Sequence, residues 1–175
     1  MEKVRRDPAS LSQLVKDFDL EVVYKGLDYD TRMITIPDVN RPALQLVGFY
    51  DYFEPKRLQV FGKSEMTFLK AMKLEDRRRV FDNLLRCEIP ALIIARNMEI
   101  FPELLEIARK HGRTLLRTKY TSVEFTAMTI DYLNHALAPV ITRHGVLVDV
   151  YGEGVLIFGD SGIGKSETAI ELIKR

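Results

Sequence analysis

Apolar residues along this chain recur at two spacings, one typical of amphipathic helices and one typical of strands. Helical spacing predicts helices at about 10–18, 63–72, 75–87, 102–111 and 122–137. Extended runs rich in β-branched, aromatic and other apolar residues predict strands at 20–24, 33–36, 57–61, 91–95 and 114–116. Between residues 43 and 53 aromatic side chains are dense, and periodicity leaves a short helix and a loop equally open.

Several boundary signals support these elements. Ser10 and Gln13 form an S-x-x-Q pattern typical of a capping box at a helix start. Pro102 suits the first position of a helix, and Gly112 suits the position after its end. For the helix at 63–72 we expect an inward face made of Met66, Phe68, Leu69 and Met72.

Strands that alternate with helices from Arg57 onward predict an α/β fold in which at least part of the sheet is parallel. We therefore expect an N-terminal α/β domain, residues 1–138, with a mixed sheet and flanking helices. Ala138-Pro139 ends the last helix and marks the predicted boundary. Residues 139–175 contain two further strand-like runs and the start of one helix, which is too little chain for a second complete domain.

The amino-acid composition is typical of a globular protein with an apolar core and a charged surface. The 175 residues are 46% apolar and 29% charged, and 26 Lys and Arg residues nearly balance 25 Asp and Glu residues. This balance gives no broad attraction to nucleic acid or to an anionic membrane. The charged N-terminus is unlike a secretory signal, and no apolar run reaches membrane-spanning length, so a cytoplasmic protein is expected. The single cysteine, Cys87, excludes an internal disulfide and is interpreted as a buried, inert thiol.

Three consecutive arginines, Arg77, Arg78 and Arg79, suggest two alternatives. They could form an anion site, or they could lie on a solvated helix face. Acidic neighbours favour the solvated face, as does helical geometry, which directs three consecutive side chains in different directions.

The stretch 159–166 carries the clearest chemistry. Its sequence, Gly159-Asp160-Ser161-Gly162-Ile163-Gly164-Lys165-Ser166, fits the phosphate-binding P-loop pattern G-x-x-x-x-G-K-[ST]. The apolar run 155–158 before it predicts the buried strand that this motif requires, and 165–174 predicts the helix that follows.

The glycines of this loop explain how it would hold a triphosphate. Gly159, Gly162 and Gly164 permit unusual backbone angles, so successive N–H groups can converge on the phosphates of ATP. The N-terminus of the following helix adds unpaired N–H groups and the positive end of its dipole. Lys165 would reach the β- and γ-phosphates, and the Ser166 hydroxyl would ligate Mg²⁺.

A further candidate is His144. The runs 140–150 and 154–158 are separated by Tyr151-Gly152-Glu153, which predicts a hairpin. In such a hairpin the start of the first strand lies opposite the end of the second, so His144 would stand beside the phosphate loop. Spacing alone leaves two interpretations equally open: contact with the γ-phosphate or attacking group, and an exposed histidine at a strand start.

Three segments resemble the family of HPr kinase/phosphorylases. These are R-H-G-V-L-V-D-V-Y-G-E-G-V-L-I-F-G-D-S-G-I-G-K-S-E-T-A-I-E-L at 143–172, D-V-N-R-P-A-L-Q-L-V-G-F-Y-D-Y-F at 38–53 and R-L-Q-V-F-G-K-S-E at 57–65. The resemblance implies a hexameric enzyme that transfers phosphate from ATP to a serine of the phosphocarrier HPr and removes it by phosphorolysis, in carbon catabolite repression. It also implies regulation by a sugar bisphosphate and inorganic phosphate, and active-site roles for His144 and Lys165.

The same resemblance places a catalytic aspartate and a metal-binding acid after Arg175, so the 175 residues alone are expected to be inactive. Asp149 and Asp160 have no family role as the base. Two other hypotheses stay open: a non-catalytic N-terminal interaction or regulatory module, and an unrelated P-loop nucleotidase that acts without a protein acceptor. Dependence of nucleotide turnover on HPr would distinguish the kinase from the nucleotidase.

Overall fold

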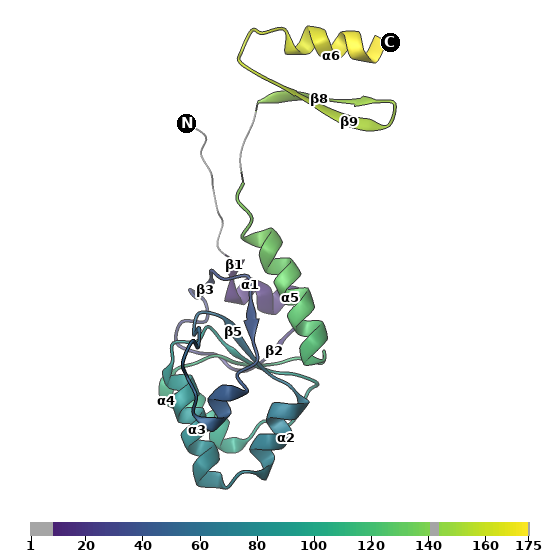
Figure 1. The fold of residues 1–175 in the computed structure, drawn as a ribbon. Coiled ribbons are helices and arrows are strands. Elements are labelled where there is room, and N and C mark those ends of the chain that lie inside the picture. The colour runs from purple at the N-terminus through teal and green to yellow at the C-terminus, as the bar shows by residue number, and fades with distance from the viewer. Residues whose placement is uncertain (1–8, 141–143, 175) are drawn as a thin grey trace. The chain divides into compact units, whose positions relative to one another are not determined.

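A five-stranded mixed sheet lies at the centre of the larger part of the chain (Figure 1). The computed structural model describes residues 9–140 and 144–174. Within the sheet the strand order is β2 (Glu21–Tyr24), β7 (Leu115–Arg117), β6 (Leu92–Ile94), β5 (Leu58–Phe61) and β4 (Val39–Asn40). Strands β4 to β7 run parallel and β2 pairs antiparallel with β7. The predicted mixed sheet is therefore confirmed.

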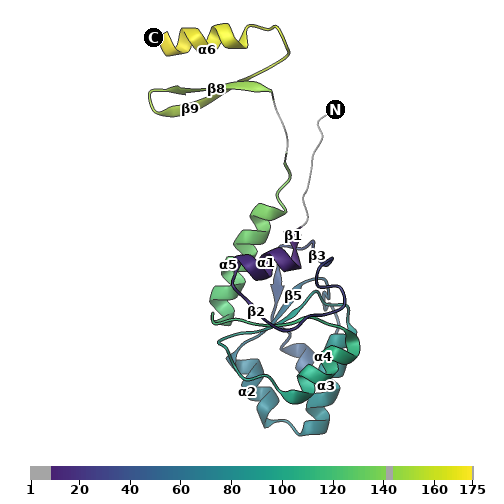
Figure 2. The ribbon, with the colours of Figure 1, turned by 180° about the vertical axis from the view of Figure 1, so that it is seen from behind.

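Helices cover both faces of this sheet, as the two opposite views show (Figures 1 and 2). One face carries α2 (Lys63–Ala71), α3 (Leu74–Arg86) and α4 (Pro102–His111), and the other carries α1 (Leu11–Asp17) and α5 (Ser122–Ala136). Alternation along each strand divides the core, since Val60 belongs to the cluster beneath α1 and α5 whereas its neighbour Phe61 belongs to the cluster beneath α2, α3 and α4.

Short elements complete this part of the chain. Strand β1 (Ala9–Ser10) pairs antiparallel with β3 (Met33–Ile34). The aromatic-rich region at 43–53 contains a 3₁₀ helix, η1 (Leu44–Val47), which ends at Gly48 with a left-handed φ of 88°. Gln45 and Leu46 are buried there, whereas Tyr52 is fully exposed. The short-helix alternative for this region is the correct one.

The helix-boundary predictions hold with one difference. Gly112 ends α4 in the left-handed conformation, with a φ of 62°. Ser10 caps α1 by accepting a hydrogen bond from the Gln13 N–H, at 3.2 Å. The Gln13 side chain donates to Asp17 instead of returning to Ser10, so the cap is one-sided.

One predicted core position is wrong. Met66 and Leu69 of α2 are buried, but Phe68 is 45% exposed. Phe68 follows Met66 by two positions, which places the two side chains on opposite sides of a helix with 3.6 residues per turn. That Phe68 is apolar was therefore not enough to predict that its side chain faces the core.

The three consecutive arginines have separate carboxylate partners. Arg77 pairs with Glu103, Arg78 with Glu106 and Arg79 with Asp76. The solvated interpretation holds for Arg78 and Arg79, whose side chains are 46% and 74% exposed, but it is wrong for Arg77, which is 15% exposed. No common anion site is formed.

Cys87 is only half-buried, so the interpretation as a buried thiol is wrong in that respect, although its surroundings agree with low reactivity. Its Sγ lies half-buried, 3.4 Å from the Asn83 carbonyl oxygen, and burial raises the pKa of the thiol. A higher pKa leaves less of the reactive thiolate at neutral pH.

A division of the chain into two compact units falls between Ala138 and Pro139. Below, the N-terminal unit means the described residues up to Ala138, and the C-terminal unit means those from Pro139 onward. None of the helices in the described ranges has the length and apolar character needed to cross a bilayer.

Candidate functional site

The C-terminal unit contains the predicted hairpin. Strands β8 (Gly145–Val150) and β9 (Glu153–Phe158) pair antiparallel through a two-residue turn, Tyr151-Gly152. Both turn residues have positive φ, 56° and 86°, as a tight hairpin turn with right-handed strand twist requires. The Asp149 carboxylate accepts a hydrogen bond from the Gly152 N–H at 2.8 Å, so this acid closes the turn at the end away from the loop.

The phosphate-loop motif joins this hairpin to a helix. Residues 159–164 follow β9 directly, and α6 (Lys165–Lys174) begins at the predicted residue. Gly162 and Gly164 have left-handed φ values of 82° and 92°, whereas Gly159 does not have a positive φ. The prediction that these glycines adopt unusual backbone angles is therefore correct for Gly162 and Gly164 and wrong for Gly159. A Cβ built on Gly162 would meet nothing within 4 Å, so the loop is open to solvent there.

Lys165 is folded back over the loop. Its Nζ donates to the carbonyl oxygens of Gly159 at 2.9 Å and Asp160 at 2.6 Å. These contacts hold the ammonium group beside the loop that contains Gly162. Ser166 is exposed, and its hydroxyl has no hydrogen-bond partner in the described part of the chain. The lysine and serine thus flank the loop from the first turn of α6.

Strand register places His144 near the same loop. Gly145 pairs with Phe158, so the residues one step beyond them, His144 and Gly159, leave the hairpin at the same end. His144 is exposed. The hairpin therefore brings together two sequence-predicted positions, fifteen residues apart, at one edge.

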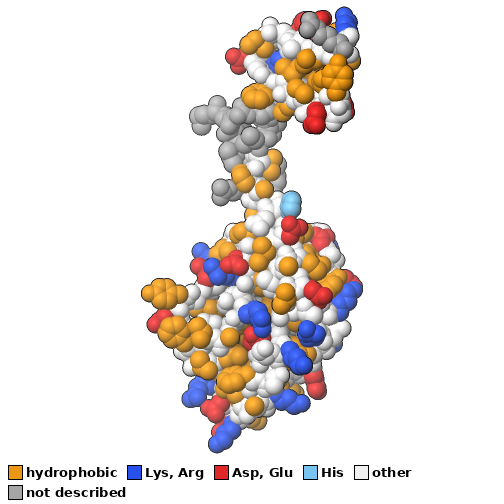
Figure 3. All heavy atoms as spheres, turned by 45° about the vertical axis from the view of Figure 1, so that its right-hand side comes forward, with side chains coloured by type: hydrophobic (Ala, Val, Ile, Leu, Met, Phe, Trp, Pro, Cys, Tyr) orange, Lys and Arg blue, Asp and Glu red, His pale blue; other side chains and the backbone are white. Residues whose placement is uncertain are grey.

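The predicted burial of β9 is wrong. Helix α6 covers one face of the hairpin, where Val148 and Ala169 are 7% and 3% exposed. On the opposite face Leu147, Leu156 and Phe158 are 71%, 51% and 62% exposed. Figure 3 shows the hydrophobic side chains gathered on the surface of this unit. One helix covers only one face of a two-stranded hairpin, as expected for a unit too small to bury its apolar residues.

Possible metal ligands are sparse. Within the described residues, no group of three or more His, Cys, Asp or Glu side chains is arranged to hold a metal ion. Three of the predicted loop residues have side-chain oxygen atoms that could bind a metal ion: Asp160, Ser161 and Ser166. This arrangement can bind phosphate through backbone N–H groups and one ammonium group, and it shows no protein-built metal cage.

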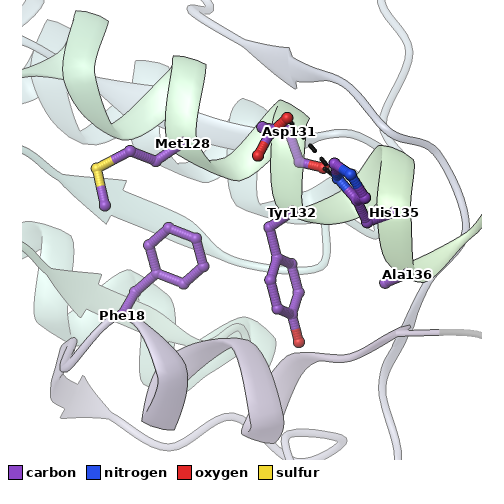
Figure 4. A pocket seen from close by; sticks show the side chains of 6 residues that line it. All are labelled: Phe18, Met128, Asp131, Tyr132, His135 and Ala136. Atoms are coloured by element: carbon purple, nitrogen blue, oxygen red, sulfur yellow. Dashed lines mark hydrogen bonds and ion pairs between the residues drawn. The ribbon is translucent and has the colours of Figure 1, made fainter. Parts of the chain in front are cut away.

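The N-terminal unit has a surface hollow that the sequence did not reveal. It lies between α1 and α5, where the Phe18 and Tyr132 rings meet edge to face with centroids 5.4 Å apart (Figure 4). Asp131 and His135 stand at its rim, 79% and 81% exposed. His135 Nδ1 lies 2.9 Å from the Asp131 carbonyl oxygen and 3.7 Å from the Asp131 carboxylate, so the nearer contact is to the backbone. That backbone contact within an exposed helical turn is not a catalytic dyad. The hollow holds none of the predicted site residues.

Comparison with protein families gives two matches. The family described as HPr Serine kinase N terminus matches residues 9–133, and the family described as HPr Serine kinase C-terminal domain matches residues 135–175.

Curated relatives agree over nearly the whole chain. The chain is similar to proteins named HPr kinase/phosphorylase from Caldicellulosiruptor bescii (46% identity over 166 residues, 95% of this chain and 53% of the relative) and Caldanaerobacter subterraneus subsp. tengcongensis (49% over 175 residues, 100% and 55%). A third, from Clostridium tetani, is 50% identical over 165 residues, 94% of this chain and 53% of the relative. The chain thus spans about half the length of the relatives it matches.

A solved structure shares the fold. The crystal structure of the CBS and DRTGG domains of the regulatory region of Clostridium perfringens pyrophosphatase, complexed with its activator diadenosine tetraphosphate, covers 75% of this chain and 50% of its own. The TM-score is 0.53 and the sequence identity is 14%, which supports similarity of fold alone.

Proposed function

The chain belongs to the HPr serine kinase family, and from that premise we propose that it supplies the phosphate-binding loop of an ATP-dependent kinase and phosphorylase that acts on a serine of HPr. The observation that carries the proposal is that Lys165 contacts Gly159 of an open glycine-rich loop while His144 lies at the end of the hairpin from which this loop leaves. We assign residues 1–138 to an N-terminal α/β domain and residues 139–175 to the start of the kinase domain.

The proposed phosphate site consists of Gly159, Asp160, Ser161, Gly162, Ile163, Gly164, Lys165 and Ser166. Backbone N–H groups of the loop and of the first turn of α6 would surround the phosphates, because the left-handed Gly162 and Gly164 turn the chain around the open space. Lys165 would exchange its contacts to two loop carbonyls for phosphate oxygens. An ammonium to phosphate bond is charge-assisted and therefore stronger than the bonds it replaces.

Ser166 is the proposed protein ligand for Mg²⁺. Its exposed and unpartnered hydroxyl fits that role, since Mg²⁺ binds few protein oxygens and takes further oxygens from substrate phosphates and water. When bound, Mg²⁺ would neutralise charge on the transferred phosphoryl group. Ser166 would fix the position of that charge relative to the loop.

His144 is the proposed second active-site side chain. It directly precedes β8, whose Gly145 pairs with Phe158, and from this end of the hairpin it would donate a hydrogen bond toward the γ-phosphoryl group or the attacking oxygen. Asp149 is bound to the turn at the other end of the hairpin, which argues against it as the base. The base would come from chain that follows in the whole protein.

Family membership also supports proposals about the assembly and the cellular role of the whole protein. We expect a homo-hexamer in which further chain or a neighbouring subunit covers the exposed face of the hairpin, and a role in carbon catabolite repression. We also expect phosphorolysis of the phosphoserine as the reverse reaction, because a loop that binds the γ-phosphate would also bind inorganic phosphate.

The test is mass spectrometry of HPr incubated with ATP, Mg²⁺ and the full-length protein, either unchanged or carrying Lys165→Ala. The control is Lys174→Ala, which removes a lysine from the far end of α6. We expect Lys165→Ala to abolish phosphorylation and its reversal, and Lys174→Ala to retain both. Full activity of Lys165→Ala would overturn the assignment, and ATP hydrolysis independent of HPr would favour the nucleotidase. If the full-length protein folds but turns over no nucleotide and leaves HPr unmodified, the regulatory-module hypothesis prevails.

A further inference from the structure

A second hollow of the N-terminal unit lies between α2 and the segment that follows β6. Its volume is about 310 Å³, and it is lined by Met66, Thr67 and Lys70 of α2 and by 98–102. Both walls follow the carboxyl ends of adjacent parallel strands, β5 and β6. Open α/β sheets commonly bind ligands beyond the carboxyl ends of their strands, and the volume lies in the range of small-molecule sites.

The floor of this hollow is apolar and preformed. Met66 is buried, and Met98, Ile100 and Phe101 are half-buried and packed against the core. Phe101 is held from behind by the Arg77 guanidinium, 4.5 Å from its ring centroid, and by Phe81, with ring centroids 6.0 Å apart. A ring fixed in this way can receive a flat apolar group without first being ordered.

The wall after β6 starts from strained backbone. Arg96 and Asn97 have left-handed φ values of 60° and 49°, and neither is glycine. Their N–H groups donate to the carbonyl oxygens of Tyr120 and Thr118, both at 2.8 Å, which holds the turn in place. Such strain is concentrated at functional sites, because surrounding contacts must maintain it.

The polar wall carries one ammonium group, from Lys70, and one carboxylate, from Glu99. Thr67 and Lys70 have no hydrogen-bond or ion-pair partner in the described residues, and Lys70 follows the buried Met66 by one helical turn. Glu99 is the acid in the lining and also has no ion-pair partner there. The unpaired Lys70 ammonium group beside the apolar floor can therefore bind an anionic group of a ligand.

We propose that this hollow binds a small molecule with a flat apolar group and one anionic group, the apolar group against Met66, Met98 and Phe101 and the anion at Lys70. The proposal is independent of the phosphate loop, which lies in the other unit.

The chain offers internal probes for a direct test. It has six methionines, at 1, 33, 66, 72, 98 and 128, and none lies in the C-terminal unit. With ¹³C-methyl methionine, NMR would follow Met66 and Met98 in the hollow, assigned by Met→Leu variants. Met72 lines a different hollow beside η1, and Met128 lines the hollow of Figure 4, so both are controls. The titrants are phenyl phosphate, benzyl alcohol and inorganic phosphate.

We expect phenyl phosphate to shift the Met66 and Met98 signals saturably at millimolar concentration while Met72 and Met128 stay unmoved. Benzyl alcohol and inorganic phosphate should each bind more weakly. Lys70→Gln should weaken phenyl phosphate binding about two- to fivefold, the range of one exposed charge pair, and leave benzyl alcohol binding unchanged. The control Lys73→Gln should change neither.

Either of two results would overturn the proposal. In one, phenyl phosphate leaves Met66 and Met98 unmoved in a folded protein. In the other, phenyl phosphate binds no more tightly than benzyl alcohol, and Lys70→Gln does not weaken its binding. The hollow would then be an apolar surface that does not recognise anions. Binding at the phosphate loop cannot mimic the expected result, because no methionine lies in that unit.

Discussion

Replacing Arg77 should destabilise the N-terminal unit far more than replacing either of the next two arginines. Arg77 of α3 pairs with Glu103 of α4, and their side chains are 15% and 5% exposed. Arg77 also donates to the Leu69 carbonyl oxygen at 3.2 Å and lies over the Phe101 ring. One side chain therefore connects α3 with the end of α2 and the start of α4.

The size of the expected loss in stability depends on how deeply each ion pair is buried. Arg77→Met would leave the Glu103 carboxylate buried without its partner, and breaking a buried pair costs about 3 to 5 kcal/mol. Arg78 and Glu106 are 46% and 58% exposed, and Arg79 and Asp76 are 74% and 45% exposed. Exposed pairs of this kind contribute about 0 to 1 kcal/mol. The expected difference is a large share of a typical domain stability of about 5 to 15 kcal/mol.

Urea unfolding followed by far-UV circular dichroism would measure these differences on Arg77→Met, Arg78→Met and Arg79→Met. The double variant Arg77→Met with Glu103→Met should recover most of the loss, because an apolar pair of similar size removes the unpaired charge. Equal losses for Arg77→Met and Arg78→Met would refute the reasoning. So would a double variant no more stable than Arg77→Met alone.

Two further predictions concern other buried positions. Gly26→Ala should destabilise the N-terminal unit by about 1 to 3 kcal/mol, since the new Cβ would lie 2.6 Å from the Gly112 carbonyl oxygen and the Thr114 nitrogen. Gly154→Ala, with no atom within 4 Å of its Cβ, should change urea unfolding by less than about 0.5 kcal/mol, and equal losses would contradict the steric argument. Tyr50→Phe tests a buried hydroxyl without a partner, whose pKa burial raises to about 12. Because the folded state disfavours its ionisation, stability should fall as pH rises from about 10 toward 12 in the unchanged protein and fall less in Tyr50→Phe. Parallel unfolding curves over that pH range would contradict this.

Local features of this protein were readable from its sequence because they depend on neighbours a few positions away. The start of α4 at Pro102 and its end at Gly112 follow from backbone preferences of proline and glycine. The hairpin of β8 and β9 and the start of α6 at Lys165 follow from two apolar runs, a turn and a glycine-rich motif. The placement of His144 beside Gly159 needed only the antiparallel register.

Other features were decided by packing between segments distant in sequence. Arg77, Arg78 and Arg79 are identical in type, yet only the first meets a buried acid. Arg78 also reaches α4, but its partner Glu106 is exposed there, and the partner of Arg79 lies on α3 itself. Phe68 is as apolar as the buried Met66, but its place on the helix directs it outward. Burial of β9 depended on how many layers cover the hairpin, which periodicity within the strand cannot indicate.

The hollow between α1 and α5 and the hollow between α2 and the segment after β6 belong to this second class. Each is formed where helices and loops far apart in the chain meet, with Met66 near Met98 in one and Phe18 near Tyr132 in the other. Short-range spacing predicted most elements and the glycine-rich loop of this protein. Only the tertiary structure determined which charged side chains are buried, which apolar faces stay exposed and where the surface is hollow. Those properties depend on the atoms that pack against a residue, and these come mostly from segments distant in sequence.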